Sequence, residues 1–281
     1  MAAHYSRSRF WKKFRRKRLA MTSLITICLL YILSLSANVW VPHEPEDIDI
    51  LKRFAGPSWE HPFGTDEMGR DVFARVVYGG RISLSVGTAA MLLAITLGSM
   101  IGAVAGFWGG IIDAVLMRIT ESILSIPVFF FVIVTLAMLG SSLGNVILVI
   151  SLTSWMATAR IVRSEILRNK ELDYVTAARA IGCSGFRILF KHALPQVFPL
   201  IIVSGTLGVA YAILIESSLS FLGLGVQPPI PSWGNMLTSA QSYLWNSPML
   251  VVYPGALIFI SVLMFNALGD GLRDALDPTL R

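Results

Sequence analysis

The segment Leu19–Val41 reads LAMTSLITICLLYILSLSANVWV and contains no charged residue over its 23 positions. An α-helix rises about 1.5 Å per residue, so it needs about 20 apolar residues to cross the hydrocarbon core of a bilayer. The basic run Arg15–Arg18 precedes the segment, as in a signal peptide, but the apolar run is long for one and continues until Pro42. We therefore predict a retained transmembrane helix at 19–41.

The rest of the chain shares this apolar character. Of its 281 residues, 54% are hydrophobic and 14% are charged, whereas an ordinary soluble domain carries about 25% charged residues. The mean hydropathy is +0.67. Period-two alternation, which a transmembrane β-barrel requires, is absent. The sequence thus predicts an all-α polytopic membrane protein with six transmembrane helices, the further five at 82–107, 114–139, 146–161, 197–215 and 250–268.

Basic residues are unevenly distributed between the predicted loops, and this bias sets the orientation. With a cytoplasmic N-terminus, the inner segments carry 17 Lys and Arg residues and the outer segments carry 4. Cytoplasmic loops are enriched in Lys and Arg, so we predict that both termini are cytoplasmic. The chain then divides into a basic tail at 1–18, the first helix at 19–41, an extracytoplasmic loop at 42–80, a five-helix core at 81–270 with a cytoplasmic loop at 162–195, and a cytoplasmic tail at 271–281.

Several function classes are excluded by the residues present. The basic clusters are separated by apolar runs and form no continuous face for nucleic acid. No Lys follows a Gly, so the chain has no Walker A loop. His4, His43, His61 and His192 match no metal-ligand spacing. We predict no catalytic residue, no metal ligand and no cofactor bound by this chain.

Three charged residues near the ends of predicted spans bear on transport. Arg118 and Glu121 lie three positions apart on one helix face, so we expect a structural ion pair. Glu216 lies near the outer end of the fifth predicted span and has no basic neighbour in sequence. It either lines a water-filled substrate path or is a solvated carboxylate at the membrane interface. A stand-alone secondary transporter is disfavoured, because such proteins bury ionisable residues at the midplane.

The loop 169–195 reads NKELDYVTAARAIGCSGFRILFKHALP and predicts two short helices. Asp173 caps the first, at 174–180, Gly182 provides a left-handed turn, and Ser184 caps the second, which ends at Lys191. Small side chains on the first helix allow another protein to approach closely. We therefore predict a docking element, with the next span opening at Pro195. Its candidate residues are Asp173, Tyr174, Thr176, Ala177, Ala178, Arg179, Gly182, Leu194 and Pro195.

The outer segments contain two further patterns. Acidic residues and the pair Arg70 and Arg75 predict ion pairs that order the 42–80 loop, and their spacing does not match a Ca²⁺-binding loop. Near the last span, Ser232 predicts the cap of a short helix over the outer mouth, with Trp233 at the membrane interface.

Four stretches resemble a known family. Thr176-Ala177-Ala178, then Gly182 and Leu194-Pro195, are similar to the EAA motif of ABC-importer permease subunits, with Thr176 in place of the acidic residue and His192 in place of Ile. The stretches HPFGTDEMGRDVF at 61–73, FLGLG at 221–225 and GDGLRDALDP at 269–278 resemble the dipeptide, oligopeptide and nickel permease group. Within that group, they are most similar to the C-type subunit.

The resemblance implies a type I permease core and a non-catalytic role in ATP-driven import. It implies the inner membrane of a bacterial or archaeal cell and three kinds of protein partner: a second homologous permease, two cytoplasmic ATPase subunits or domains that carry ATP and Mg²⁺, and an external substrate-binding protein. The loop at 162–195 is then the coupling loop that contacts an ATPase. Peptides are the expected substrate, with nickel or a metal chelate as the alternative.

Overall fold

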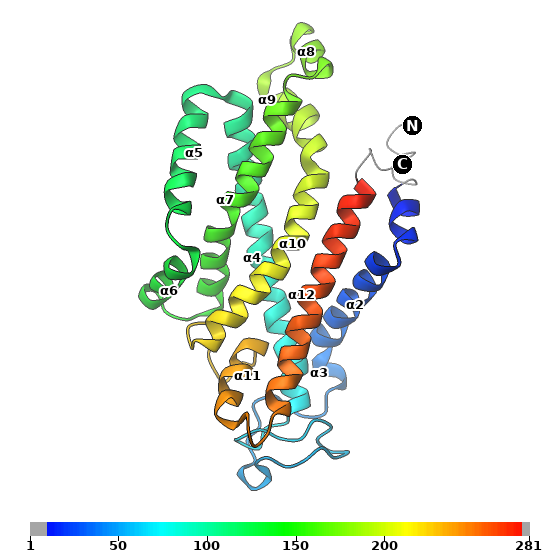
Figure 1. Ribbon diagram of the computed structural model, residues 1–281, viewed down its shortest axis with the longest axis vertical. Helices are drawn as coiled ribbons and strands as arrows, with labels where there is room; N and C mark the ends of the chain where they lie inside the picture. The colour runs from blue at the N-terminus through cyan, green and yellow to red at the C-terminus, as the bar shows by residue number, and fades with distance from the viewer. Residues whose placement is uncertain (1–9, 277–281) are drawn as a thin grey trace.

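The computed structural model describes residues 10–276, and these form an elongated bundle of helices (Figure 1). The remaining residues include parts of both predicted cytoplasmic tails and lie outside this description. Within the described residues there is no strand, and one isolated bridge joins Thr65 and Asp71. The predicted all-α class is confirmed. The helices are α2 (Arg18–Leu35), α3 (Ala37–Trp40), α4 (Val72–Trp108), α5 (Gly110–Leu124), α6 (Val128–Leu139), α7 (Leu143–Asn169), α8 (Asp173–Ala180), α9 (Gly185–Ile188), α10 (Leu194–Phe221), α11 (Trp233–Ala240) and α12 (Met249–Leu276).

Five helical segments in the described chain are long and apolar enough to cross a membrane. They are α2, α4, α7, the segment 185–221 and α12. The third predicted span is not one straight helix, because α5 and α6 meet at an angle of 83°. Pro127 lies at the break; it has no N–H for the helical ladder and disfavours helix in the residue before it. Counting the bent pair as one crossing gives six.

The ion pair predicted within this third segment, between Arg118 and Glu121, is not formed, and a different ion pair is found instead. Arg118 and Glu121 are both exposed and form no ion pair within the part of the chain that is described. Instead, Arg163 on α7 donates from two nitrogens to Asp113 in the first turn of α5, with Nη2 2.5 Å from Oδ2. The pair joins two helices that lie far apart in sequence, so spacing along one helix does not reveal it.

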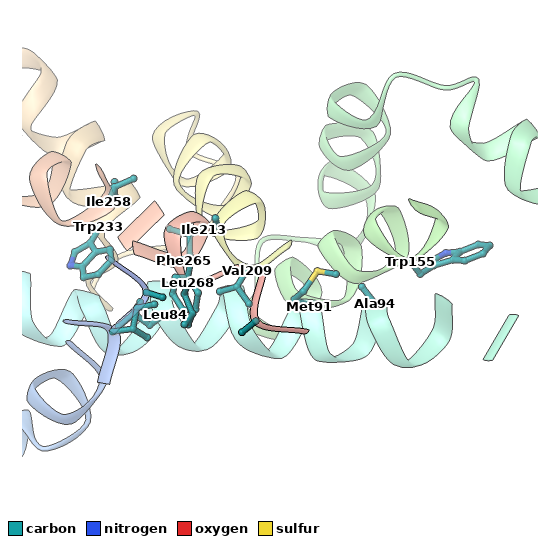
Figure 2. Packing of buried hydrophobic residues seen from close by; sticks show 14 of the residues in the cluster. Leu84, Met91, Ala94, Trp155, Val209, Ile213, Trp233, Ile258, Phe265 and Leu268 are labelled. Atoms are coloured by element: carbon teal, nitrogen blue, oxygen red, sulfur yellow. The ribbon is translucent and has the colours of Figure 1, made fainter. Parts of the chain in front are cut away.

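The centre of the bundle is the close packing of α4 against α7. Gly98, Gly102 and Gly106 form one stripe on α4 at intervals of four residues. A Cβ atom on Gly102 would lie 2.3 Å from the carbonyl oxygen of Ala159, so only glycine permits this approach. Such small-residue spacing lets helix backbones meet in a membrane. Larger side chains from α4, α7, α10 and α12 fill the adjoining core, as Figure 2 shows.

The first and last spans lie side by side. Lys17, just before α2, forms an ion pair with Asp274 near the end of α12. Gly271 contacts Ala20, where an added Cβ would lie 2.3 Å from the alanine methyl. The start of α2 and the end of α12 are therefore at the same end of the bundle (Figure 1).

Candidate docking helix and outer pocket

The short helix α8 projects beyond the other helices at the end of the bundle where α2 begins and α12 ends (Figure 1). Its N-cap position is occupied by Leu172, without a side-chain hydrogen bond. Asp173 is the first helical residue and not the cap, which corrects the predicted role. Its carboxylate still lies at the positive end of the helix dipole, where a negative charge is favourable.

Gly182 ends α8 as predicted, with φ of +82°. The Cys183 N–H donates to the Ala178 carbonyl at 3.0 Å, and the Gly182 N–H donates to the Arg179 carbonyl at 3.0 Å. These two bonds form a Schellman motif, which needs a left-handed residue at this position. A side chain at Gly182 would meet no atom within 4 Å, so the requirement is purely one of backbone conformation.

Of the two central alanines of α8, Ala177 is exposed and Ala178 is buried. Ala178 is buried together with Val175 and Ile188, and Phe107 packs against them. Ala178 therefore seats α8 on the bundle and is not part of a docking surface. The exposed residues of the predicted set on α8 are Asp173, Tyr174, Thr176, Ala177 and Arg179.

Two apolar residues that the sequence analysis did not select extend this exposed face. Ile181 is 81% exposed and Phe186, in α9, is 66% exposed. The Phe186 ring stacks edge-on against Trp108, with ring centroids 5.1 Å apart. Their exposure, which the sequence alone does not show, is the signal that identifies them.

The second predicted helix of the loop is continuous with the next span. Ser184 occupies the N-cap of α9 without a side-chain hydrogen bond. The π-helix Leu189–Ala193 then joins α9 to α10, so no break occurs at Lys191. Pro195 lies in the first turn of α10 and cannot donate to the carbonyl four residues earlier, and a π-turn accommodates such a position. Leu194 and Pro195 thus belong to the spanning helix.

At the opposite end, ion pairs order the outer loop as predicted. Arg70 Nε lies 2.7 Å from Asp66 Oδ2, and its Nη2 lies 2.8 Å from Glu67 Oε1. Arg75 Nε lies 3.5 Å from the same Asp66 oxygen. Burial is the main cause that raises the pKa of the Glu67 carboxyl group. The network fixes the loop above the start of α4.

Ser232 is the N-cap of α11 and forms a capping box with Asn235, which confirms the predicted cap. Trp233, however, is 1% exposed, and its Nε1 donates to the Val76 carbonyl at 2.9 Å. It anchors α11 inside the bundle and does not lie at the membrane interface. Long-range packing with α4 satisfies the indole N–H that an interface would otherwise solvate.

Glu216 is completely buried. The sequence predicted contact with water, either in a substrate path or at the membrane interface, and both predictions are wrong. Its carboxylate accepts hydrogen bonds from Ser83 at 3.0 Å, Ser220 at 2.8 Å and Ser217 at 3.4 Å. Ser83 also accepts from the Trp233 N–H at 3.2 Å. The carboxylate is a structural junction between α4, α10 and α11.

A cavity of about 610 Å³ opens beside the loop 42–80, and Glu216 does not line it. Acidic residues from the loop after α3 form one part of its wall, and Arg81 on α4 forms another. Arg81 is exposed and has no ion-pair partner in the described chain. The lining residues are Glu44, Pro45, Glu46, Tyr78, Arg81, Ile82, Ser85, Val86, Leu143, Ile147, Ile230 and Pro231.

Comparison with known proteins covers almost the whole chain. The dipeptide transport system permease protein DppC of Bacillus subtilis is 41% identical over 276 residues, which cover 96% of this chain and 85% of the relative. The glutathione transport system permease protein GsiD of Pectobacterium atrosepticum is 38% identical over 273 residues, which cover 97% of this chain and 91% of the relative. The DppC protein of Alkalihalophilus pseudofirmus is 40% identical over 271 residues, covering 96% and 89%.

Two family descriptions match two separate parts of the chain. Residues 7–57 match the N-terminal TM domain of oligopeptide transport permease C. Residues 83–281 match the binding-protein-dependent transport system inner membrane component. The chain therefore belongs to the family of binding-protein-dependent transport system inner membrane components and carries the N-terminal domain of its C-type permeases.

Proposed function

We propose that this chain forms half of the translocation path for short peptides in an ATP-driven importer of a bacterial or archaeal inner membrane. As a membrane permease subunit it is not an enzyme. ATP and Mg²⁺ belong to two partner ATPase subunits or domains. A second homologous permease completes the path, and an external binding protein delivers the substrate to the outer end.

The observation that carries the substrate assignment is the charge arrangement of the outer pocket. Glu44 and Glu46 present negative charge, and Arg81 presents positive charge, within walls that also include Ile82 and Ile147. A short peptide is a zwitterion with an ammonium group at one end and a carboxylate at the other. Arg binds carboxylates through two parallel hydrogen bonds, so this pocket suits both ends of a peptide.

The same pocket disfavours the nickel alternative. None of its described lining residues is His or Cys, the side chains that bind nickel and similar metals well. The named relatives that are assigned a substrate are dipeptide and glutathione permeases, and both substrates are short peptides. Their names support a peptide and do not select a length.

The exposed face of α8 supports the proposed contact with an ATPase. Val175 and Ala178 hold the helix against the bundle, and Ala177 and Tyr174 remain exposed. The chain turns at Gly182 and enters α9, which is continuous with α10, so a force applied at α8 acts on a spanning helix. With the cytoplasm at this end, the basic loop and both chain ends are cytoplasmic, in agreement with the positive-inside rule.

The experiment is uptake of radiolabelled dipeptide by cells that carry Arg81→Gln in place of the wild-type chain. Loss of a charged hydrogen-bond donor costs about 1.5–3 kcal/mol, so the half-saturation concentration should rise by about tenfold or more. Arg53→Gln is the matched control, because Arg53 lies in the outer loop but does not line the pocket. Dipeptide uptake unaffected by deletion of the chain, together with lost nickel uptake, would contradict the peptide assignment.

A further inference from the structure

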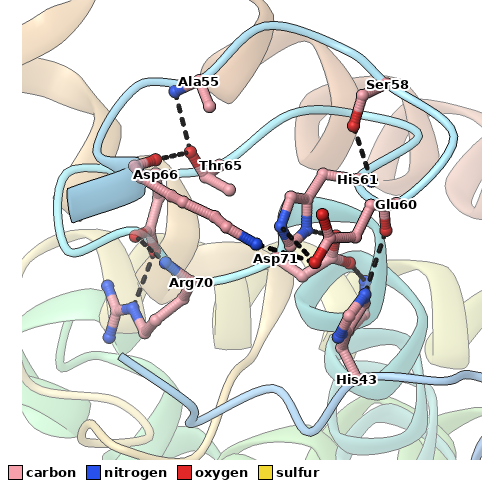
Figure 3. Close-up of polar contacts among 11 residues, drawn as sticks. His43, Ala55, Ser58, Glu60, His61, Thr65, Asp66, Arg70 and Asp71 are labelled. Carbon is pink, nitrogen blue, oxygen red and sulfur yellow. Dashed lines mark hydrogen bonds and ion pairs between the residues drawn. The ribbon is translucent and has the colours of Figure 1, made fainter. Parts of the chain in front are cut away.

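Three residues of the outer loop place metal-ligating atoms close together. His43 follows the first span, and Glu60 and His61 lie 17 and 18 residues further on. One ligand atom from each lies within 4.8 Å of the other two (Figure 3). No spacing rule joins these residues in sequence, and the fold of the loop alone brings them together.

His61 is held in the tautomer that a metal requires. The side chain is nine-tenths buried, and its Nδ1 lies 2.8 Å from Asp71 Oδ2. Asp71 also accepts from the Ala74 N–H at 2.6 Å, as the N-cap of α4, so its carboxylate is an acceptor and His61 Nδ1 is the donor. A carboxylate behind a histidine ligand orients the ring and raises its basicity.

The other ring nitrogen of His61 has no hydrogen-bond partner. His61 Nε2 is buried and unsatisfied among the described residues. A buried polar atom without a partner is costly, so this nitrogen is available to bind a ligand. The nearest carboxylate oxygen, Glu60 Oε1, lies 3.9 Å away, close to the separation of about 3.3 Å between two ligands of one tetrahedral zinc ion.

The other two ligands, His43 and Glu60, are less buried than His61. The Glu60 side chain is 59% exposed, and its Oε1 lies 2.7 Å from Lys52 Nζ. This hydrogen bond with Lys52 lowers the pKa of Glu60, so the carboxylate is ionised at neutral pH. The His43 ring is centred 4.9 Å from the His61 ring, with its Nε2 3.0 Å from the Glu60 carbonyl oxygen.

We propose that His43, Glu60 and His61 bind a Zn²⁺ ion. Two imidazoles and one carboxylate are a common three-residue zinc ligand set, and the fourth position is left for water on the exposed side. Mg²⁺ and Ca²⁺ prefer oxygen ligands and fit two imidazoles poorly. The ion joins the segment after the first span to the turn before α4.

Zinc in this position would fix the position of the acidic wall of the outer pocket. Glu44 directly follows His43 and lines the pocket together with Glu46. Fixing His43 therefore fixes the acidic wall. This consequence for transport rests on the proposed function, whereas zinc binding itself does not.

The test is zinc binding to the purified full chain, prepared with an affinity tag that contains no histidine. Competition with a fluorescent zinc chelator should give one bound equivalent. His43→Gln and Glu60→Gln should each weaken the affinity at least tenfold. Lys52→Gln is the matched control: it removes the ion pair with Glu60 and keeps all three ligands, so its affinity should equal or exceed that of the wild type.

Two further measurements separate ligand loss from misfolding. His43→Cys supplies another zinc ligand and should restore the affinity that His43→Gln loses. Zinc should slow amide hydrogen exchange in residues 43–61 of the wild type and not of His43→Gln. Absence of a bound equivalent in the wild type, unchanged affinity in both ligand variants, or binding of Ni²⁺ without Zn²⁺ would overturn the proposal.

Discussion

Glu216 shows how an ionisable side chain can serve the structure of a transport protein. Three serine hydroxyls donate to its carboxylate, and the group is shut off from water. Serine hydroxyls replace water here as the hydrogen-bond donors. Since Ser83 also accepts from the Trp233 N–H, the carboxylate holds α11 in place through one intermediate residue.

Substitutions at Glu216 separate the volume of the side chain from the role of its carboxyl group. Glu216→Ala leaves a cavity and unpaired hydroxyls, which costs about 2–4 kcal/mol. We expect a fall of about 5–10 °C in the melting temperature of the detergent-solubilised chain. Glu216→Gln keeps the shape and one carbonyl oxygen that accepts hydrogen bonds, so it should melt within about 2 °C of the wild type.

Both Glu216 variants should keep the wild-type half-saturation concentration for peptide in transport assays, because Glu216 does not line the outer pocket. A changed half-saturation concentration with an unchanged melting temperature would place Glu216 in the substrate path.

Among the elements, α8 has a buried side and an exposed side that substitution can distinguish. Ala177→Trp adds bulk on the exposed side and should keep an ATPase subunit from docking. We expect the ATPase to be lost from the purified complex, or to hydrolyse ATP without peptide uptake. Ala177→Ser is the matched control and should behave as the wild type. Wild-type uptake by Ala177→Trp with the ATPase still attached would exclude α8 as the coupling element.

The α4–α7 pair depends on the absence of side chains along the glycine stripe. Gly102→Ala places a Cβ 2.3 Å from the Ala159 carbonyl oxygen, and such overpacking costs about 1–3 kcal/mol. Gly255→Ala in α12 is the control, because no atom lies within 4 Å of its added Cβ. Removing a helical glycine there should raise the unfolding free energy by up to about 1 kcal/mol. Equal melting temperatures for the two variants would show that α4 and α7 can separate at little cost.

At the scale of the whole molecule, α8 and the outer loop lie at opposite ends (Figure 1). This arrangement predicts opposite labelling of two exposed positions in intact cells. In a chain whose two cysteines are replaced by serine, Trp59→Cys should react with a membrane-impermeant maleimide, because Trp59 is fully exposed on the outer loop. Ile181→Cys, 81% exposed beside α8, should react only after the membrane is opened. The reverse pattern would invert the proposed orientation.

Local features of the structure could be predicted from the sequence because they depend on neighbouring residues. Long apolar runs specify spanning helices whatever their partners, since each unsatisfied backbone group is costly in lipid. The left-handed turn at Gly182 and the cap at Ser232 also depend only on neighbouring residues, and both predictions are confirmed. The bend between α5 and α6 could also have been predicted from the sequence, because Pro127 lies at the bend.

Features that join distant segments were decided by the tertiary structure alone. Composition does not tell which of Ala177 and Ala178 faces inward, because Phe107 and Ile188 define that side only after folding. Glu216 and Trp233 resemble interfacial residues in sequence, and they are buried because Ser83 and Val76 on α4 supply their hydrogen-bond partners. Apolar patterning sets which segments enter the membrane, whereas contacts between helices set which polar groups are enclosed there.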